Sequence, residues 1–338
     1  MNRKSGPQLA AVVVLLVALI LVGTVVKGEY LLHLFILMMM NVVLASSLRL
    51  INLSGQLSLA HGGMVTLGAY TSALFVMKLG LSSWLGLLAA GVVAAVVSCL
   101  IGIPFTRLKG IYFTMVSIFF VQIVILTVQQ WRSLTGGASG LYGIPRPDGF
   151  LGIVFKTKSS FFFLILVITV VSLLIMWAIE HSRVGMTFRG IQQAGSLAES
   201  VGINTTKYKV LAFTAGGFFA GIVGAFYAHY ISTLDPTAFS FLFTIYILIY
   251  MIVGGAGSFL GPIVGAAFLT LVPEVARPLK SYMPLLFAAI LMLVIFFMPE
   301  GLVALPTRLI KALRRSPAGG GDTGQPGAAQ AHIPRGES

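Results

Sequence analysis

The stretch FFFLILVITVVSLLIMWAI (161–179) contains no charged residue, no glycine and no proline. A helix rises about 1.5 Å per residue, so a run of this kind crosses the roughly 30 Å hydrocarbon core of a bilayer. A soluble domain has too little polar surface to cover many such segments. The stretch therefore predicts a transmembrane helix, and the rest of the chain repeats the pattern.

Comparable apolar runs recur along the whole sequence. They cover 9–26, 31–48, 62–78, 84–104, 111–130, 161–179, 208–231, 238–253, 257–273 and 283–298. Of the 338 residues, 57% are hydrophobic and only 9% are charged, and the mean hydropathy is +0.98. Soluble domains carry about 25% charged residues. The sequence predicts an all-α polytopic membrane protein with about ten transmembrane helices.

Charge placement predicts the orientation of these helices. The chain has 22 Lys and Arg against 9 Asp and Glu, a net charge of +13, and most of them lie between apolar runs. Topology explains this excess better than nucleic-acid binding does, because alternation from a cytoplasmic N-terminus places more of the cations inside. We expect a multi-pass membrane protein with both termini cytoplasmic.

The two ends of the chain carry separate predictions. The run within 1–30 is too long for a signal-peptide core and is expected to be the first transmembrane helix. Residues 306–338 begin basic and become rich in Pro, Gly and Ala, which predicts a disordered cytoplasmic tail. The domain between them is expected to span 31–305.

One stretch between apolar runs, 50–61, mixes polar residues with apolar ones. Irregular backbone at membrane depth must be buried in protein or line a cavity, so a re-entrant or broken helix is expected there. Faint echoes between Gly62–Tyr70 and Gly216–Phe226 suggest an inverted repeat, relating runs two to five to runs seven to ten. Two glycine stripes, at Gly217/Gly221 and at Gly257/Gly261/Gly265, favour close helix packing within the chain over a subunit interface.

The chemistry missing from the chain restricts its energy source. The acids fall at span ends or in loops, and the mid-span polar candidates are Gln122, Thr114 and Ser117, with His229 near an outer end. Ion-coupled carriers usually hold ionisable groups within the membrane. There is also no phosphate-binding G-x-x-x-x-G-K-[ST] motif and no H-E-x-x-H or G-x-S-x-G motif. An active transporter of this kind must take its energy from a partner.

Two loops are long enough to carry more than a connection. The inner loop from Ser182 to Lys209 has apolar and polar residues interleaved and a break at Gly202, which predicts a short amphipathic helix. Such a helix either docks a soluble partner or lies on the membrane surface alone. The outer loop, Trp131–Gly149, is rich in turn formers and exposes residues suited to contact.

Three stretches resemble the permease subunits of bacterial branched-chain amino-acid ABC importers, of the LivM type. They are LSGQLSLAHGGMVTLGAY (53–70), LTGGASGLYGIP (134–145) and the segment from Arg183 to Phe213. GAFYAHY (224–230), GGAGSFLGPIVGA (254–266) and PEGL (299–302) extend the likeness over most of 35–305. The chain departs from the family pattern at 192–195, where relatives have an Arg-acid-x-acid sequence.

The resemblance implies a permease of the bacterial inner membrane rather than an enzyme. Its partners would be a second, LivH-like permease, two ABC ATPase subunits and a soluble substrate-binding protein. ATP and Mg²⁺ would bind those ATPases, so no cofactor and no metal is expected on this chain. Leucine, isoleucine or valine would be the substrate, moved by alternating access. Urea, sugar or amide permeases are the nearest alternatives, and an ion-coupled carrier or a membrane enzyme are alternatives of other classes.

The same resemblance implies three sets of site residues. The ATPase-coupling helix would use Arg183, Gly185, Arg189, Ile191, Gln192, Leu197, Ala198, Glu199, Gly202 and Ile203. The loop that meets the binding protein would use Trp131, Gly136, Gly137, Tyr142 and Arg146. The signature near the translocation path would be Gly55, Gln56, Ser58, His61, Gly68 and Tyr70.

Overall fold

The computed structural model describes residues 28–108, 110–149, 155, 157–275, 282–297 and 301–304. The expected first helix at 9–26 and the tail at 306–338 lie outside the described residues. The elements in chain order are α2 (Glu29–Asn52), α3 (His61–Leu79), α4 (Ser83–Phe105), α5 (Ile111–Gln130), α6 (Arg132–Thr135), η1 (Gly137–Ser139), β1 (Leu141–Tyr142), α7 (Lys158–His181), α8 (Arg183–Ser200), α9 (Thr205–Ile231), β2 (Thr233–Leu234), α10 (Phe241–Gly254), α11 (Gly261–Val275), α12 (Met283–Phe297) and η3 (Leu302–Ala304).

Helices occupy every predicted apolar run that falls within the described residues, and 161–179 lies inside α7. Five of the described helices are long and apolar enough to cross a membrane, namely α2, α4, α5, α7 and α9. α3 has 19 residues, but α10, α11 and α12 have 14, 15 and 15. These last three fall short of the about 20 residues of a full span. The all-α polytopic prediction is confirmed, with unequal helix lengths.

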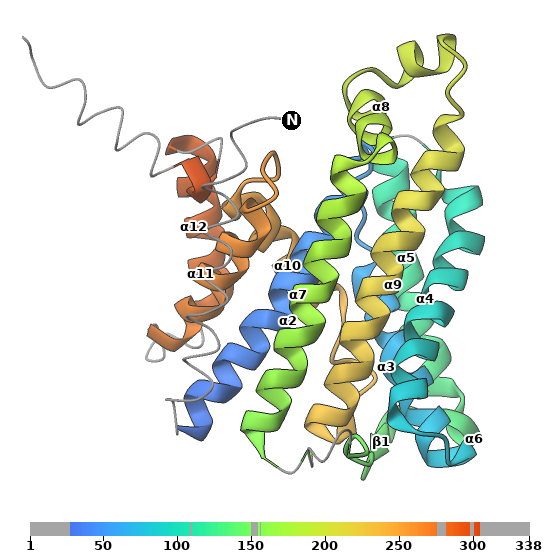
Figure 1. Ribbon diagram of the computed structural model, residues 1–338, viewed down its shortest axis with the longest axis vertical. Helices are drawn as coiled ribbons and strands as arrows, with labels where there is room; N and C mark the ends of the chain where they lie inside the picture. The colour runs from blue at the N-terminus through green and yellow to red at the C-terminus, as the bar shows by residue number, and fades with distance from the viewer. Residues whose placement is uncertain are drawn as a thin grey trace, which may run out of the picture. The chain divides into compact units, whose positions relative to one another are not determined.

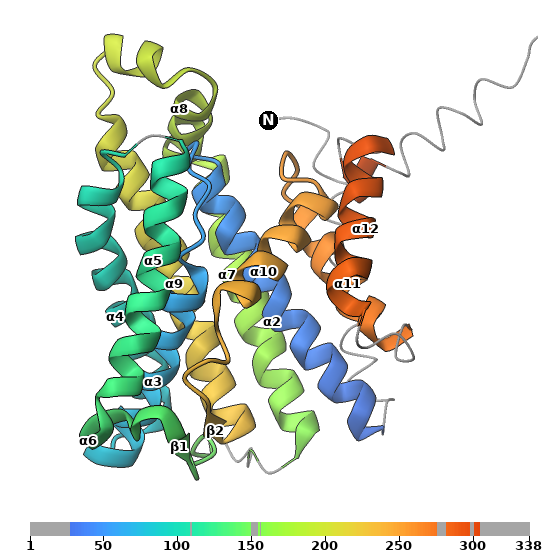
Figure 2. The same cartoon turned by 180° about the vertical axis from the view of Figure 1, so that it is seen from behind.

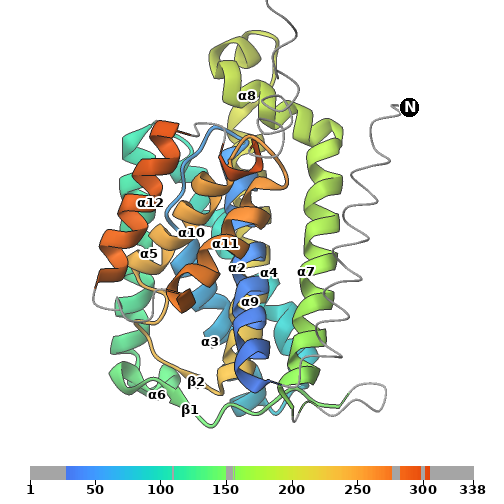
Figure 3. The same cartoon turned by 90° about the vertical axis from the view of Figure 1, so that its left-hand side faces the viewer.

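The connecting segments gather at two opposite ends of the helices. α8 lies at one end, whereas α6, β1 and β2 lie at the other (Figures 1 and 3). β1 and β2 pair antiparallel, with Leu141 opposite Leu234 and Tyr142 opposite Thr233. The loops that the alternation assigned to the outer side therefore meet each other, and the α8 loop lies at the far end. We call these the β-ribbon end and the α8 end.

Close backbone contact joins α3, α4 and α9. A Cβ atom on Gly68 would lie 2.2 Å from the carbonyl oxygen of Gly221, and one on Gly221 would lie 2.6 Å from that of Ala90. Only glycine permits helices to approach this closely. The Gly217/Gly221 stripe thus packs within the chain, as predicted. The other stripe is partly wrong, because Gly257 lies in the loop between α10 and α11 rather than on a helix.

Two irregular segments interrupt the helices, and each is partly buried. Residues 53–60 follow α2 and lead to α3, and 235–240 follow β2 and lead to α10; Figure 2 shows them running from opposite ends of the helices. Their ends meet where the amide of Gly62 donates to Oγ1 of Thr244 (3.0 Å). The break expected at 50–61 is confirmed, although α2 continues to Asn52. Each interruption follows the first helix of its block, which is the placement an inverted repeat requires.

Candidate functional site

The predicted amphipathic helix exists and is longer than the sequence suggested. α8 runs from Arg183 to Ser200 and contains a kink at Ala194 (φ −153°, ψ 79°). The kink falls within 192–195, where the sequence departs from the family pattern. The helix ends as predicted before Gly202, whose φ of +84° suits glycine. Ile203 then donates its amide to the Ala198 carbonyl (3.0 Å) and closes the end.

α8 contacts the ends of α2 and α9. Gly185 and the side chains of Phe188, Ile191 and Ala198 are buried. Gln192 donates to the Asn52 carbonyl at the end of α2 (3.1 Å), and the ring of Phe188 meets that of Tyr208 on α9 edge-on. Thr205, at the start of α9, donates to Oε1 of Glu199 (2.6 Å). A movement of α8 would therefore act on the ends of α2 and α9 through these contacts.

Part of the predicted apolar side of α8 faces outward. Ile191 and Ala198 are buried, but Leu197 and Val201 are 69% and 72% exposed, and Met186 is 62% exposed. The apolar residues of this segment therefore divide between two sides: Ile191 and Ala198, seven residues apart, lie on the buried side, and Leu197 and Val201 lie on the exposed side. Large apolar side chains exposed beyond the ends of membrane helices are typical of a protein contact surface.

An ion-pair network at the α8 end escaped the sequence analysis. Arg49 on α2 donates from Nη1 and Nη2 to the two carboxylate oxygens of Glu180 on α7, at 2.6 and 2.9 Å. Arg189 on α8 donates from Nη2 to Oε1 of the same carboxylate (2.6 Å). Glu180 was interpreted only as an acid at a span end. Its partner Arg49 lies 131 residues away, and no spacing in the sequence signals that pairing.

The six signature residues lie around the break between α2 and α3. Gln56, Ser58, His61, Gly68 and Tyr70 are buried, whereas Gly55 is exposed and lies against the backbone of Gln192 on α8. Nε2 of His61 lies 2.9 Å from Oγ of Ser47, and its Nδ1 has no hydrogen-bond partner among the described residues. The hydroxyl of Tyr70 reaches the Leu234 carbonyl (3.4 Å). These residues connect α3 to α2, to α8 and to the β-ribbon end.

The predicted outer contact loop is held in place by hydrogen bonds to α5 and to the end of α9. Thr135 donates to the Val128 carbonyl (2.5 Å), and Ile144 donates its amide to the Ser232 carbonyl (3.1 Å). Of the five predicted residues, Gly137 is buried, and the others are exposed: Trp131, Gly136, Tyr142 and Arg146. Trp131 and Tyr142 expose 54% and 67% of their surface. The loop presents aromatic and cationic groups on a hydrogen-bonded base.

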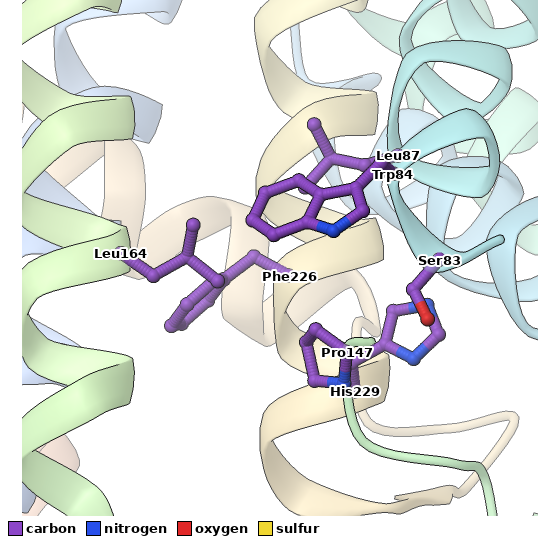
Figure 4. Close-up of a pocket in the computed structure, with 7 residues that line it drawn as sticks. All are labelled: Ser83, Trp84, Leu87, Pro147, Leu164, Phe226 and His229. Atoms are coloured by element: carbon purple, nitrogen blue, oxygen red, sulfur yellow. The ribbon is translucent and has the colours of Figure 1, made fainter. Parts of the chain in front are cut away.

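Two cavities lie at the β-ribbon end. One, of about 10 Å³, is enclosed by Ser83, Trp84, Leu87, Pro147, Leu164, Phe226 and His229 (Figure 4). This volume holds about one water molecule. The other, of about 280 Å³, is lined by His33, Arg146, Thr157, Lys158, Phe161, Tyr230 and Ile231. Neither cavity includes a residue of the junction between α3 and α10.

Comparison with known proteins shows the family of the chain. The family described as branched-chain amino acid transport system / permease component matches residues 30–299. The chain is 28% identical over 296 residues to the high-affinity branched-chain amino acid transport system permease protein LivM of Salmonella typhimurium, covering 81% of this chain and 70% of the relative. The LivM protein of Escherichia coli is also 28% identical, over 298 residues, with the same coverage.

A second kind of permease is related as well. The LivH permease protein of Salmonella typhimurium is 25% identical over 269 residues, covering 75% of this chain and 87% of the relative. No solved structure matches the chain at a significant level. The family match covers every described transmembrane helix except the first residue of α2. The chain therefore belongs to the branched-chain amino-acid transport permease family.

Proposed function

We propose that this chain is one of two membrane subunits of an ATP-driven importer of branched-chain amino acids. Two comparisons support the role: the family match over 30–299 and the resemblance to both LivM and LivH. The observation that carries the mechanism is α8. It exposes Met186, Leu197 and Val201 at one end of the protein while it is bonded to α2, α7 and α9.

In this proposal α8 is seated on a separate ATPase subunit, which binds ATP and Mg²⁺. The exposed apolar side chains supply the contact, and the bonded ones transmit its movement to the transmembrane helices. The α8 end is then cytoplasmic, and the β-ribbon end faces the outside of the inner membrane. The N- and C-termini would both be cytoplasmic. Transport would follow alternating access, with ATP-driven movement of α8 shifting the population of two states.

The β-ribbon end would receive a soluble substrate-binding protein. Trp131, Tyr142 and Arg146 are exposed there on a loop held by backbone hydrogen bonds to α5 and to the end of α9. A preordered loop loses little conformational entropy on binding. Aromatic residues and arginine are also the side chains most enriched at protein interfaces.

The second permease would contact the outer face of α5. Gln122 lies at the middle of this helix and is exposed, among Met115, Phe119 and Leu126. An amide facing lipid would lack hydrogen-bond partners, whereas one facing another subunit can find them. The exposed face of α4, by contrast, carries Leu85, Val92, Val96 and Leu100, all apolar and compatible with lipid.

Reconstitution tests the proposed function. The chain would be purified with its neighbouring permease, ATPases and binding protein and placed in proteoliposomes with ATP inside or outside. We expect leucine uptake that requires ATP on the α8 side and stops with a hydrolysis-deficient ATPase. Isoleucine and valine should compete, whereas urea and sugars should not. Uptake by the chain alone, driven by an ion gradient, would contradict the proposal.

A further inference from the structure

Glu180 joins four elements at the α8 end. It is the last buried residue of α7, and its two oxygens accept three hydrogen bonds from two arginines. One arginine, Arg49, stands near the end of α2, and the other, Arg189, stands on α8. Arg49 also donates from Nε to the Ala256 carbonyl (2.8 Å) and lies over the ring of Phe259 (6.0 Å to its centroid). The network thus extends to the loop between α10 and α11.

The burial of the network is uneven. The side chains of Arg49 and Glu180 are each 4% exposed, whereas that of Arg189 is 48% exposed. Arg49 and Glu180 are the two ionised side chains that are buried in the part of the chain the structure describes. A buried, bidentate arginine–carboxylate pair is rigid in both distance and angle. Arg189 is therefore the half-exposed link to α8, and the Arg49–Glu180 pair is the buried base of the network.

The local backbone strengthens this attachment. A Cβ atom on Gly185 would lie 2.2 Å from the Glu180 carbonyl oxygen, so the first turn of α8 lies directly against the end of α7. Ser182, between the two helices, caps α8 by accepting from the Val184 amide (3.2 Å). The connection between α7 and α8 is therefore short and tightly packed, and a displacement of α8 is transmitted directly to the Glu180 carboxylate.

We propose that Glu180 is the relay that couples α8 to the transmembrane helices, with Arg189 as its positioning residue on α8. Movement of α8 pulls on the carboxylate through Arg189. The carboxylate then displaces Arg49, and Arg49 displaces the end of α2 and the α10–α11 loop. This inference rests on the proposed function, because it takes α8 to be the element that the ATPase moves.

The first test measures uptake and ATP hydrolysis together in the reconstituted complex. Arg189→Gln removes the cation that bonds Glu180 but leaves the buried pair intact. We expect uptake to fall at least tenfold while ATP hydrolysis stays within twofold of the wild type, so that amino acid moved per ATP falls. Arg189→Lys keeps the charge and should recover part of the uptake. Lys207→Gln is the matched control, because it removes an exposed cation on α9 at the same end.

The outcomes separate this inference from the proposed function. Parallel loss of uptake and hydrolysis in Arg189→Gln would mean that Arg189 acts in docking the ATPase, and unchanged uptake would mean that it has no role. Either result overturns the relay. If the wild-type complex shows no ATP-driven uptake, the proposed function itself fails.

A distance measurement tests the relay without transport. Spin labels at Gly190→Cys on α8 and Gly257→Cys in the α10–α11 loop would sit in open space, with the native Cys99 replaced by Ser. In the complex, the distance between the labels should stay the same with and without trapped nucleotide, because the network moves as a unit. When Arg189→Gln is added, trapping the nucleotide should shift or broaden the distribution of distances between the labels. A shift of equal size in both backgrounds would overturn the relay.

Discussion

Arg49 and Arg189 bind the same carboxylate, but burial makes their contributions to stability unequal. Arg49→Met leaves Glu180 with one exposed partner, and breaking a buried ion pair costs about 3–5 kcal/mol. Arg189 is 48% exposed, so Arg189→Met should cost only about 0–1 kcal/mol. We expect the apparent melting temperature of the purified permease to fall much more for Arg49→Met. Lys207→Met is the control, and equal losses for the two arginine variants would contradict this ranking.

Asp235 caps a turn at the β-ribbon end of the structure. Its Oδ1 accepts from the amide and from the hydroxyl of Thr237, at 2.7 and 2.8 Å. An asparagine oxygen can accept the same two bonds. Asp235→Asn should therefore leave uptake within about twofold of the wild type, whereas Asp235→Ala should lower protein yield. A large loss of uptake by the folded Asn variant would show that this carboxylate binds a ligand.

At the scale of one element, the end of α8 should be sensitive to small changes. Gly202 adopts a φ of +84° and donates its amide to the Glu199 carbonyl (3.0 Å), and proline can do neither. Gly202→Pro should abolish ATP-dependent uptake while the protein still inserts in the membrane. Glu199→Arg should have the same effect, because it removes the acceptor of Thr205.

Membrane fractionation, complex recovery and uptake would be compared for both variants, with Lys207→Gln again as the control. Normal uptake by Gly202→Pro and Glu199→Arg would remove the basis for the coupling role of α8.

The elements could be predicted from sequence to different degrees. Apolar runs are local, so the helices from α2 to α12 that cross or enter the membrane were anticipated within a few residues. The polar residues at 50–61 also signalled the first break. The second break was missed, because the run 238–253 was taken to begin with helix, whereas its first three residues belong to the irregular segment and α10 begins only at Phe241. The exposure of Leu197 was not anticipated either, because the interleaved pattern alone does not show which side of α8 packs against the other helices.

Sites were harder to predict than helices, because they depend on residues that are distant in the sequence. Glu180 has an ordinary position at a span end, and only folding brings Arg49 to it across 131 residues. Gln122 was visible as a mid-span amide, but its exposure depends on how α5 packs. The roles of the α8 residues, the outer loop and the signature residues remain predictions for the experiments above.

For the whole molecule, the proposed contact of α5 with a second permease can be tested through Gln122. Gln122→Leu should weaken recovery of the second permease in co-purification by about threefold or more, because buried interhelical amide bonds are worth roughly 0.6–2 kcal/mol in membranes. Val96→Leu, on the apolar exposed face of α4, is the control and should change nothing. Undiminished recovery of the pair with Gln122→Leu would place the interface on another face.

The contact between the two irregular segments can form only late in the synthesis of the chain. The amide of Gly62 is bonded by a hydroxyl, that of Thr244, which lies 182 residues further along the chain. At about 5–20 residues per second, the ribosome supplies that residue roughly 10–40 s later. Until then the start of α3 stands in or beside the bilayer with a polar group unpaired, where lipid offers no substitute. The start of α3 can therefore reach its final bonding only after the start of α10 has been synthesised.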